Sequence, residues 1–489
     1  MRKADRSAPD WLRPVALKWP CVALCAALIL TVALVTIAAS ARALEQDESD
    51  EPNWDQITAE ATDLLSRYIR VNTTNPPGNE LDAAELLRKK FASEGIPSLV
   101  YQPAPSRGVV AARLRGTGKY RKSLMLLSHM DVVPANAKDW QVDPFLGTVK
   151  NGEIWGRGAL DDKGPGVIEL MAMLTIKRSG ILLDRDIVFL ATGDEEVGGK
   201  LGAGWVVEHQ RDLLNDVGYL LNEGGEVRVE PDGHKFYEVS ITEKSPLWIR
   251  LTATGPAGHP SIPPEQTAVT RLIHALNKLV NYQPTITIDP LVDREFRRRS
   301  TLGHRAAAAR DLRKALKDPA FAKQFLSVPA QAALVRNTIT PTMLDGSEKI
   351  NVIPSSASAE IDCRLLPGED AKAFLQTLKE LISDENIKLD VLLNFPSASS
   401  PEKSTLMSAI EQLAARLDNK APVIPTMLAG FTDSHYFRQL GIVAYGFIPL
   451  EVTQEQARTV HGANERVSIS NLRGAIERMT RLLRIVGNQ

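Results

Sequence analysis

Carboxylate and imidazole side chains gather where short apolar runs of the sequence end. His129 and Asp131 end the stretch LMLLSHMD, Glu195 and Glu196 end FLATGDEE, and Glu223 follows YLLN. Imidazole and carboxylate groups are the ligands that first-row divalent metal ions favour in proteins. Carboxylates can also act as general bases. The clusters therefore suggest either a metal site or acid–base chemistry.

Two further segments carry side chains of the same types. Asp161 and Asp162 lie in GRGALDDKG, and His461 lies in VHGANERVS. A lone histidine near a strand end is more often structural than a ligand, and a lone loop aspartate usually caps a helix or turn. The argument for a metal site therefore depends on several such residues recurring at successive strand ends. Composition and spacing alone leave both interpretations open.

The apolar runs also indicate the elements that position these side chains. Each run is short, uncharged and bounded by polar residues, which is typical of strands buried on both faces of a sheet. Helical patterns lie between the runs, notably over residues 166–177. Strands that alternate with helices predict an α/β domain with a mostly parallel sheet. Ligands of such sheets bind at the carboxyl ends of the strands, where all three clusters lie.

After residue 239 the pattern changes to strands that alternate between apolar and polar side chains. A strand, a helix over 264–280, two strands, a helix over 371–382 and a strand over 388–393 predict a small α+β domain. Residues 293–335 form a basic, helix-prone excursion within it. The expected organisation is a catalytic domain over 51–239 and 397–489, interrupted by an inserted domain over 240–396.

The amino-terminal residues 1–50 are expected to be a signal peptide or membrane anchor with a linker. A basic lead precedes residues 19–41, which carry no charge and are long enough to cross a bilayer. The small residues that follow resemble a signal-peptidase site, so we expect export to the periplasm or the cell exterior, with or without anchoring. The net charge of −1 gives no indication of a nucleic-acid partner. Only Cys363 lies outside the leader, which excludes a disulfide within the body of the chain.

The ordered motifs of the chain resemble a known enzyme family. LLSHMDVVP, GRGALDDKG, TGDEEVGG, LNEGG, GPAGHPS, KINVIP with DCRLLPG, GFTDSHYFR and HGANER occur in this order. Together they are similar to the di-zinc aminoacylase, carboxypeptidase S, carboxypeptidase G and succinyl-diaminopimelate desuccinylase family, nearest to the carboxypeptidase S and secreted N-acyl-amino-acid hydrolase branch. The resemblance implies a zinc-exopeptidase-like catalytic domain with a ferredoxin-like lid or dimerisation domain inserted into it.

The resemblance also implies a site with two divalent metal ions, zinc in the family. The matched metal ligands are His129, Asp161, Glu196, Glu223 and His461, with Asp161 bridging the two ions. The family pattern has a cis peptide after the bridging aspartate, here between Asp161 and Asp162.

The matched catalytic residues are Glu195, Asp131 and His259. In the family pattern Glu195 is the general base for a water held between the metals. Asp131 orients the imidazole of His129. His259, on the inserted domain, helps to stabilise the oxyanion, and in dimeric relatives it reaches the neighbouring subunit's site, so a homodimer is expected.

Substrate contacts follow from three further matches. Arg364 corresponds to an arginine that binds a substrate carboxylate, Asn351 to a neighbouring polar contact, and Gly430 to the start of a loop that lines the site. His435 departs from the pattern, because aminoacylases and carboxypeptidase S usually have arginine there. The substrate that this chain prefers is therefore left open by the resemblance.

The sequence thus predicts a metal-dependent hydrolase that cleaves a peptide or N-acyl amide bond beside a free amino-acid carboxylate. An aminopeptidase or dipeptidase of the same family is the nearest alternative. A non-catalytic binding protein on the same scaffold would be expected to lack the base or the ligands, and this chain has both. A membrane-tethered structural protein would be expected to have scattered polar motifs instead of ordered ones.

Overall fold

The computed structural model of the protein describes residues 52–230, 232–301 and 310–489. The predicted leader, residues 19–41, lies outside these ranges. In the described part of the chain, no helix has both the length and the apolar character needed to cross a membrane.

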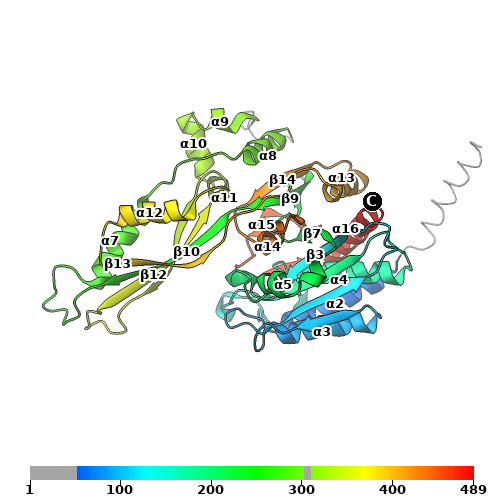
Figure 1. Ribbon diagram of the computed structural model, residues 1–489, viewed down its shortest axis with the longest axis horizontal. Helices are drawn as coiled ribbons and strands as arrows, with labels where there is room; N and C mark the ends of the chain where they lie inside the picture. Colours follow the sequence, from blue (N-terminus) through cyan, green and yellow to red (C-terminus); the bar gives the residue numbers. More distant parts are fainter. Residues whose placement is uncertain (1–51, 231, 302–309) are drawn as a thin grey trace, which may run out of the picture. The chain divides into compact units, whose positions relative to one another are not determined.

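A large mixed sheet forms the core of the catalytic part (Figure 1). Its strand order is β1-β2-β6-β3-β7-β15-β9-β8-β16, and β14 pairs with β9. The central strands β6, β3, β7 and β15 are parallel, whereas β1 and β2 join antiparallel at one edge. The strands are β1 (Ser98–Tyr101), β2 (Val109–Leu114), β3 (Ser123–His129), β6 (Ile187–Thr192), β7 (Val217–Asn222), β8 (Val227–Val229), β9 (Lys235–Glu243), β14 (Val423–Leu428), β15 (Val443–Gly446) and β16 (Glu451–Val452).

Both faces of the central strands are buried, which explains why the strands read as unbroken apolar runs. Leu124 and Leu126 of β3 face one hydrophobic cluster, while Met125 and Leu127 face another on the opposite side. The first face is covered by α2 (Trp54–Arg70), α3 (Glu80–Ser93), α4 (Lys163–Arg178), α13 (Thr405–Leu417) and α16 (Ile469–Gly487). The second face is covered by α5 (Ala203–His209), α6 (Arg211–Leu214) and α14 (Ser434–Arg438). The catalytic part therefore has three layers, with the sheet in the middle.

A small second sheet lies beside the candidate site. Its order is β17-β5-β4, with all pairs antiparallel, formed by β4 (Thr148–Lys150), β5 (Glu153–Trp155) and β17 (Arg466–Ser468). Two short 3-10 helices, η2 (Ala137–Asp139) and η3 (Glu195–Val197), and the helix α15 (Gln454–Ala457) lie in loops of the catalytic part. Because β5 and β17 are far apart in the sequence, this sheet brings the loop between α15 and β17 next to the loop between β5 and α4.

The inserted domain has its own sheet and its own core. Its antiparallel strand order β11-β12-β10-β13 is that of a ferredoxin-like fold, built from β10 (Ser245–Thr254), β11 (Thr338–Asp345), β12 (Ser356–Leu365) and β13 (Ile387–Asn394). The helices α7 (Ala268–Asn281) and α12 (Ala371–Ile382) pack on one face. As the alternating sequence predicted, Ile361, Cys363 and Leu365 of β12 are buried in this core.

The basic excursion is helical but packs on the catalytic part. It contains α8 (Pro290–Ser300), α9 (Leu312–Ala315), α10 (Pro319–Leu326) and α11 (Pro329–Ala333). Val292, Phe296 and Phe325 belong to the hydrophobic cluster of the large sheet, and Arg299 pairs with Glu238 of β9. The segment between β10 and β11 is thus divided between the two cores.

Candidate active site

The candidate ligands meet at the carboxyl edge of the parallel strands. β3 ends at His129, β6 leads into η3 with Glu195 and Glu196, and β7 ends immediately before Glu223. These three strands are neighbours in parallel register, so their carboxyl ends lie side by side. The sequence prediction that the three clusters converge agrees with this arrangement.

Asp161 lies between two histidines that are far apart in the sequence. Its Oδ1 is 2.9 Å from Nε2 of His129, and its Oδ2 is 3.0 Å from Nε2 of His461. Each oxygen of one carboxylate therefore faces a different imidazole, which is the arrangement that a ligand shared by two metal ions requires. The peptide between Asp161 and Asp162 is cis, as the family pattern predicts.

The remaining carboxylates complete one set of donors on each side of Asp161. Oε2 of Glu196 is 3.3 Å from Nε2 of His461, and Oε1 of Glu223 is 3.7 Å from Nε2 of His129. Two ligand atoms on one tetrahedral zinc ion are separated by about 3.3 Å, given bond lengths of about 2 Å. Donor atoms of His129, Glu195 and Glu223, and of His129, Asp161 and Glu196, lie within 4.8 Å of one another. The spacing fits two adjacent divalent ions.

The electrostatics of the site also fit divalent cations. Burial raises the pKa of Glu195 and of Glu223 well above the usual range, and neighbouring negative charges add to the effect. Hydrogen bonds to Asp161 and Glu196 raise the pKa of His461 to about 10. Oε1 of Glu196 is buried and has no hydrogen-bond partner among the described residues. Two divalent cations would neutralise the crowded carboxylates, and one of them would give Oε1 of Glu196 a partner. The residues present therefore fit a pair of divalent metal ions.

Asp131 connects His129 to the turn that carries the glutamate pair. The Nδ1 atom of His129 lies 2.9 Å from the backbone carbonyl of Asp131, and 3.6 Å from its carboxylate, which is too long for a hydrogen bond. The carboxylate instead accepts the backbone N–H groups of Glu195 and Glu196, each at 3.2 Å. Asp131 thus orients the imidazole through its backbone and the glutamate pair through its side chain.

A buried polar network behind this turn was not predicted from the sequence. Asn75 donates to Asp131 at 2.8 Å, and Arg107 pairs with both Asp194 and Glu80 at 2.7 Å. Asp194 precedes Glu195 and has a left-handed backbone with a φ of 74°. Sequence spacing cannot reveal this buried arginine with two carboxylate partners, because Arg107, Glu80 and Asp194 come from three separate segments.

Comparison with known proteins agrees with this geometry. The model of peptidase family M20/M25/M40 matches residues 125–485. The N-fatty-acyl-amino acid synthase/hydrolase PM20D1 of Xenopus tropicalis is 30% identical over 390 residues, covering 78% of this chain and 76% of its own length. Aminoacylase-1A of Rattus norvegicus is 27% identical over 430 residues, covering 86% and 93%. The M20 metallo-carboxypeptidase Sso-CP2 of Sulfolobus solfataricus shares the fold with a TM-score of 0.68 at 21% identity, covering 88% and 99% of the two chains.

The chain belongs to peptidase family M20/M25/M40. It is therefore a metal-dependent hydrolase of peptide or N-acyl amide bonds, as the ordered motifs predicted. The predicted fold class, an α/β catalytic domain with an inserted α+β lid domain, is confirmed.

One predicted catalytic residue of this M20 chain lies outside the ligand cluster. His259 is exposed on the inserted domain, and its Nδ1 is 2.7 Å from the hydroxyl of Ser261. Its loop is held against the segment before β12 by two backbone hydrogen bonds between Gly258 and Ile353. Asn351 is exposed in that same neighbouring segment. The structure thus places His259 and Asn351 together, on a surface of the inserted domain.

Arg364, the predicted carboxylate-binding residue, is already engaged in an ion pair. Its Nε and Nη2 donate to the two oxygens of Asp362, at 2.6 and 2.7 Å. Its guanidinium lies 4.6 Å from the ring centroid of Phe431 and 5.9 Å from that of Trp248. One edge of the guanidinium is thus occupied, and Nη1 is left for another acceptor. Gly430, the residue before Phe431, is half-buried.

His435, which replaces the family's usual arginine, is an uncharged part of a packed aromatic cluster. Its ring is stacked on Phe395 at a centroid distance of 3.5 Å, and its Nδ1 lies 2.9 Å from the carbonyl of Thr432. Burial lowers the pKa of His435 to about 4. The substitution therefore removes a positive charge from this loop, because the imidazole is neutral at pH 7.

Replacing His435 by phenylalanine is expected to make the protein less sensitive to acid. Imidazole in the unfolded chain titrates near ~6.5, whereas folded His435 titrates near pH 4. Above pH ~6.5 the imidazole is neutral in both the folded and the unfolded chain, so the lowered pKa does not change the free energy of unfolding. As the pH falls from ~6.5 to ~4, only the unfolded chain takes up the proton. The free energy of unfolding therefore falls by up to about 3 kcal/mol. His435→Phe keeps the ring stacking and lacks this loss. Urea midpoints of both proteins in chelator at pH 7, 5.5 and 4 measure the difference, and a difference that does not change with pH contradicts the assignment.

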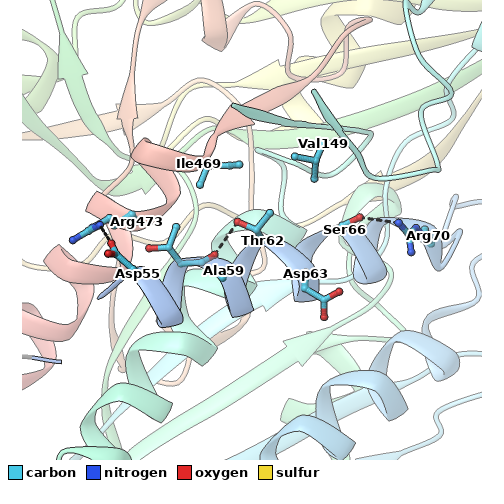
Figure 2. A pocket seen from close by; sticks show the side chains of 10 residues that line it. Asp55, Ala59, Thr62, Asp63, Ser66, Arg70, Val149, Ile469 and Arg473 are labelled. Carbon is cyan, nitrogen blue, oxygen red and sulfur yellow. Dashed lines mark hydrogen bonds and ion pairs between the residues drawn. The ribbon is translucent and has the colours of Figure 1, made fainter. Parts of the chain in front are cut away.

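A surface groove of about 600 Å³ lies apart from this site (Figure 2). It runs along α2 and is bordered by Val149 and Ile469. Its charged and polar side chains are largely paired with one another: Arg473 with Asp55, and Arg70 with the hydroxyl of Ser66. None of the predicted site residues lines the groove, so we assign it no part in the M20 chemistry.

Proposed function

We propose that the protein hydrolyses the amide bond of N-acyl amino acids, releasing a fatty or other acyl acid and a free amino acid. The observation that carries the proposal is the placement of Asp161 between His129 and His461, with Glu195 buried beside them. The relatives named N-fatty-acyl-amino acid synthase/hydrolase and aminoacylase support this substrate class over others of the family. Peptides with a free carboxyl terminus offer the same bond and the same carboxylate, so carboxypeptidase action is the second candidate.

The metal ligands are proposed to be His129, Asp161, Glu196, Glu223 and His461, and the metal to be zinc. Two imidazoles and three carboxylates, without a thiolate, suit Zn²⁺ and the other first-row divalent ions. When bound, two such ions supply Lewis acidity, which polarises the amide carbonyl and makes water more acidic. Metal analysis of the purified protein that finds no stoichiometric divalent metal would overturn this assignment.

Glu195 is proposed to move the proton. It lies at the edge of the cluster, with its backbone held by Asp131, and burial raises the pKa of its carboxyl group. A carboxylate with a raised pKa takes a proton from water more readily, and it can then deliver that proton to the leaving nitrogen. Asp131 and the network of Asn75, Arg107 and Asp194 keep the base in place without touching the reacting atoms.

A substrate panel tests the proposed function. The metal-loaded protein is assayed against N-acyl amino acids, dipeptides and the same compounds with their carboxylate blocked as an amide. We expect N-acyl amino acids to be cleaved with the highest kcat/KM, and blocked substrates to be cleaved poorly. A preference for dipeptides with a free amino terminus, unaffected by blocking the carboxylate, would instead support the aminopeptidase or dipeptidase alternative.

Replacing Arg364 by alanine is expected to raise KM for carboxylate-bearing substrates. A hydrogen bond to a charged group contributes about 1.5–3 kcal/mol, which corresponds to roughly a 10–100-fold change in affinity. The KM of blocked substrates is expected to be unchanged. Arg250→Ala is the matched control, because Arg250 is also paired with a carboxylate on β12, that of Glu360. An unchanged KM in Arg364→Ala would exclude the carboxylate-binding role, in which Asn351 and Gly430 are proposed to take part.

A homodimer is proposed to cover the surface that carries His259 and Asn351. Ile262 and Ile350 lie near these two residues in the sequence; Ile262 is 80% exposed and Ile350 is fully exposed. A second copy that covers this surface would bury the isoleucines and bring His259 to a neighbouring site. Analytical ultracentrifugation of the wild type and of Ile350→Lys tests the proposal; a wild-type protein that stays monomeric at micromolar concentration would overturn it.

Export is proposed from residues 19–41, which lie outside the described part of the chain. The uncharged stretch after a basic lead supports this proposal. Cell fractionation with amino-terminal sequencing of the purified protein tests it. An intact amino terminus on protein from the soluble cytoplasmic fraction would contradict export.

A further inference from the structure

Glu465 is a buried carboxylate with no assigned role, four residues after His461. Its side chain has no exposed surface. A fully buried carboxylate is costly unless hydrogen-bond donors surround it. The donors around Glu465 therefore indicate what this residue stabilises.

All four of the donors lie in residues 157–161, the loop that leads to and includes Asp161. Oε1 of Glu465 accepts the backbone N–H of Leu160 at 2.7 Å and that of Asp161 itself at 3.0 Å. Oε2 accepts the backbone N–H of Gly158 at 3.1 Å and Nη1 of Arg157 at 2.7 Å. Three of the four hydrogen bonds are thus made by backbone amides, and one of these belongs to the bridging aspartate.

The small sheet explains how two distant loops meet at this point. Arg466 of β17 pairs with Trp155 of β5, and the backbone N–H of Gly156 continues the ladder by donating to the carbonyl of Glu465 at 3.0 Å. The residue before β17 is therefore held next to the loop that follows β5. Gly158 has a φ of 91°, a left-handed conformation that a residue with a side chain rarely adopts, and its amide points to Glu465.

We propose that Glu465 is a positioning residue of the dinuclear metal site. Its carboxylate joins the loop that carries His461 to the loop that carries Asp161, so that the two oxygens of Asp161 face His129 and His461 before a metal arrives. The proposal rests on the proposed bridging role of Asp161. The hydrogen bonds of Glu465 would then fix the position of the His461 loop relative to Asp161, although the two segments are about 300 residues apart in the sequence.

An ordinary buried ion pair would not need this arrangement. Arg157 supplies only one of the four donors, and its guanidinium also lies 5.3 Å from the ring of Trp140. The backbone amides of Leu160 and Asp161 donate to Oε1, whereas Arg157 donates to Oε2, so these two hydrogen bonds are not part of the ion pair. The contacts therefore describe a carboxylate that orders a backbone segment, and the segment ends at a metal ligand.

Replacing Glu465 by glutamine tests the proposal through metal affinity. The amide nitrogen of glutamine cannot accept a hydrogen bond, so at least one of the two pairs of donors loses its acceptor. Loss of such a supporting partner typically weakens metal binding about 10–100-fold. Competition with a chromophoric chelator, below the melting temperature of every variant, is expected to show this loss for Glu465→Gln.

Glu295→Gln is the matched control, because Glu295 is also buried and ion-paired but lies on α8. It is expected to lower the melting temperature while both metal affinities stay at the wild-type value. Metal affinities at the wild-type value in folded Glu465→Gln would overturn the positioning role. If Glu465→Gln binds metal weakly while the wild type cleaves no substrate of the panel, the positioning role stands and the proposed substrate class fails.

Hydrogen exchange on the wild-type protein gives a second test that needs no folded variant. Because Glu465 supplies the acceptors, the amides of Gly158, Leu160 and Asp161 are expected to be protected from exchange in the metal-free protein. Metal loading is expected to add little protection to this peptide. Amides that exchange freely until metal is added would show that the metal orders the loop, and would overturn the proposal even if Glu465→Gln does not fold.

Discussion

Glu195→Gln is expected to lower kcat by about 10²–10⁴-fold while both metal ions stay bound. The range is that of a positioned general base, and glutamine has the same shape but cannot take a proton. The backbone of Glu195 stays held by Asp131, because that hydrogen bond does not involve the substituted group. Steady-state kinetics and metal content of the same preparation measure both parts of the expectation.

Glu196→Gln separates the roles of the two neighbours. Oε2 of Glu196 lies near His461 and its Oε1 is buried without a partner, as expected of a metal ligand. This variant is expected to lose affinity for one metal ion, and its activity is expected to recover partly at high metal concentration. The donor atoms of Glu195 also lie within 4.8 Å of those of His129 and Glu223. Loss of metal from Glu195→Gln and not from Glu196→Gln would therefore reverse the two assignments.

Asp161→Asn is expected to reduce the metal content to one ion or none for each chain and to lower kcat/KM by about 10³-fold or more. One oxygen of Asp161 faces each histidine, so an amide nitrogen in place of either oxygen removes a donor from one of the two sites. Loss of one Lewis acid costs several kcal/mol of transition-state stabilisation, and each 1.36 kcal/mol is a tenfold change in rate. Elemental analysis and kinetics check the two effects.

Asp162→Asn is the control for this substitution. Asp162 is the next residue and is buried, so the same substitution is made in the same loop at a residue that is not a proposed ligand. Its Oδ2 accepts the backbone N–H of His129 at 3.1 Å, and an asparagine oxygen can do the same. We expect this variant to keep two metal ions. Equal metal content in Asp161→Asn and Asp162→Asn would argue against a bridging ligand at Asp161.

The convergence of His129, the glutamate pair and Glu223 could be predicted because it depends on local patterns. Runs such as LMLL are apolar at every position, which is typical of strands buried on both faces. Parallel strands place their carboxyl ends along one edge, so residues that follow such runs meet without any knowledge of loop conformations. The alternating pattern around Ile361 predicted the inserted sheet for the same reason.

Other features of the site depend on contacts that local patterns do not encode. The family pattern predicts that the carboxylate of Asp131 orients His129. In the structure this carboxylate accepts hydrogen bonds from the backbone of Glu195 and Glu196, because the loop after β3 lies next to η3. Arg364 was expected to be available to substrate, but a strand places residues two apart on one face, and Asp362 occupies one edge of its guanidinium.

The sequence by itself determined the donor chemistry, the strands that lead to most of the proposed ligands, and the family to which the motifs point. These follow from residue types and from periodicities of a few residues. Only the tertiary structure decided that His435 is uncharged, that the basic excursion packs on the catalytic core, and that Glu465 holds the loop of Asp161. Each of these depends on groups brought together from distant segments, because burial and hydrogen bonding are set by the packing of the whole chain.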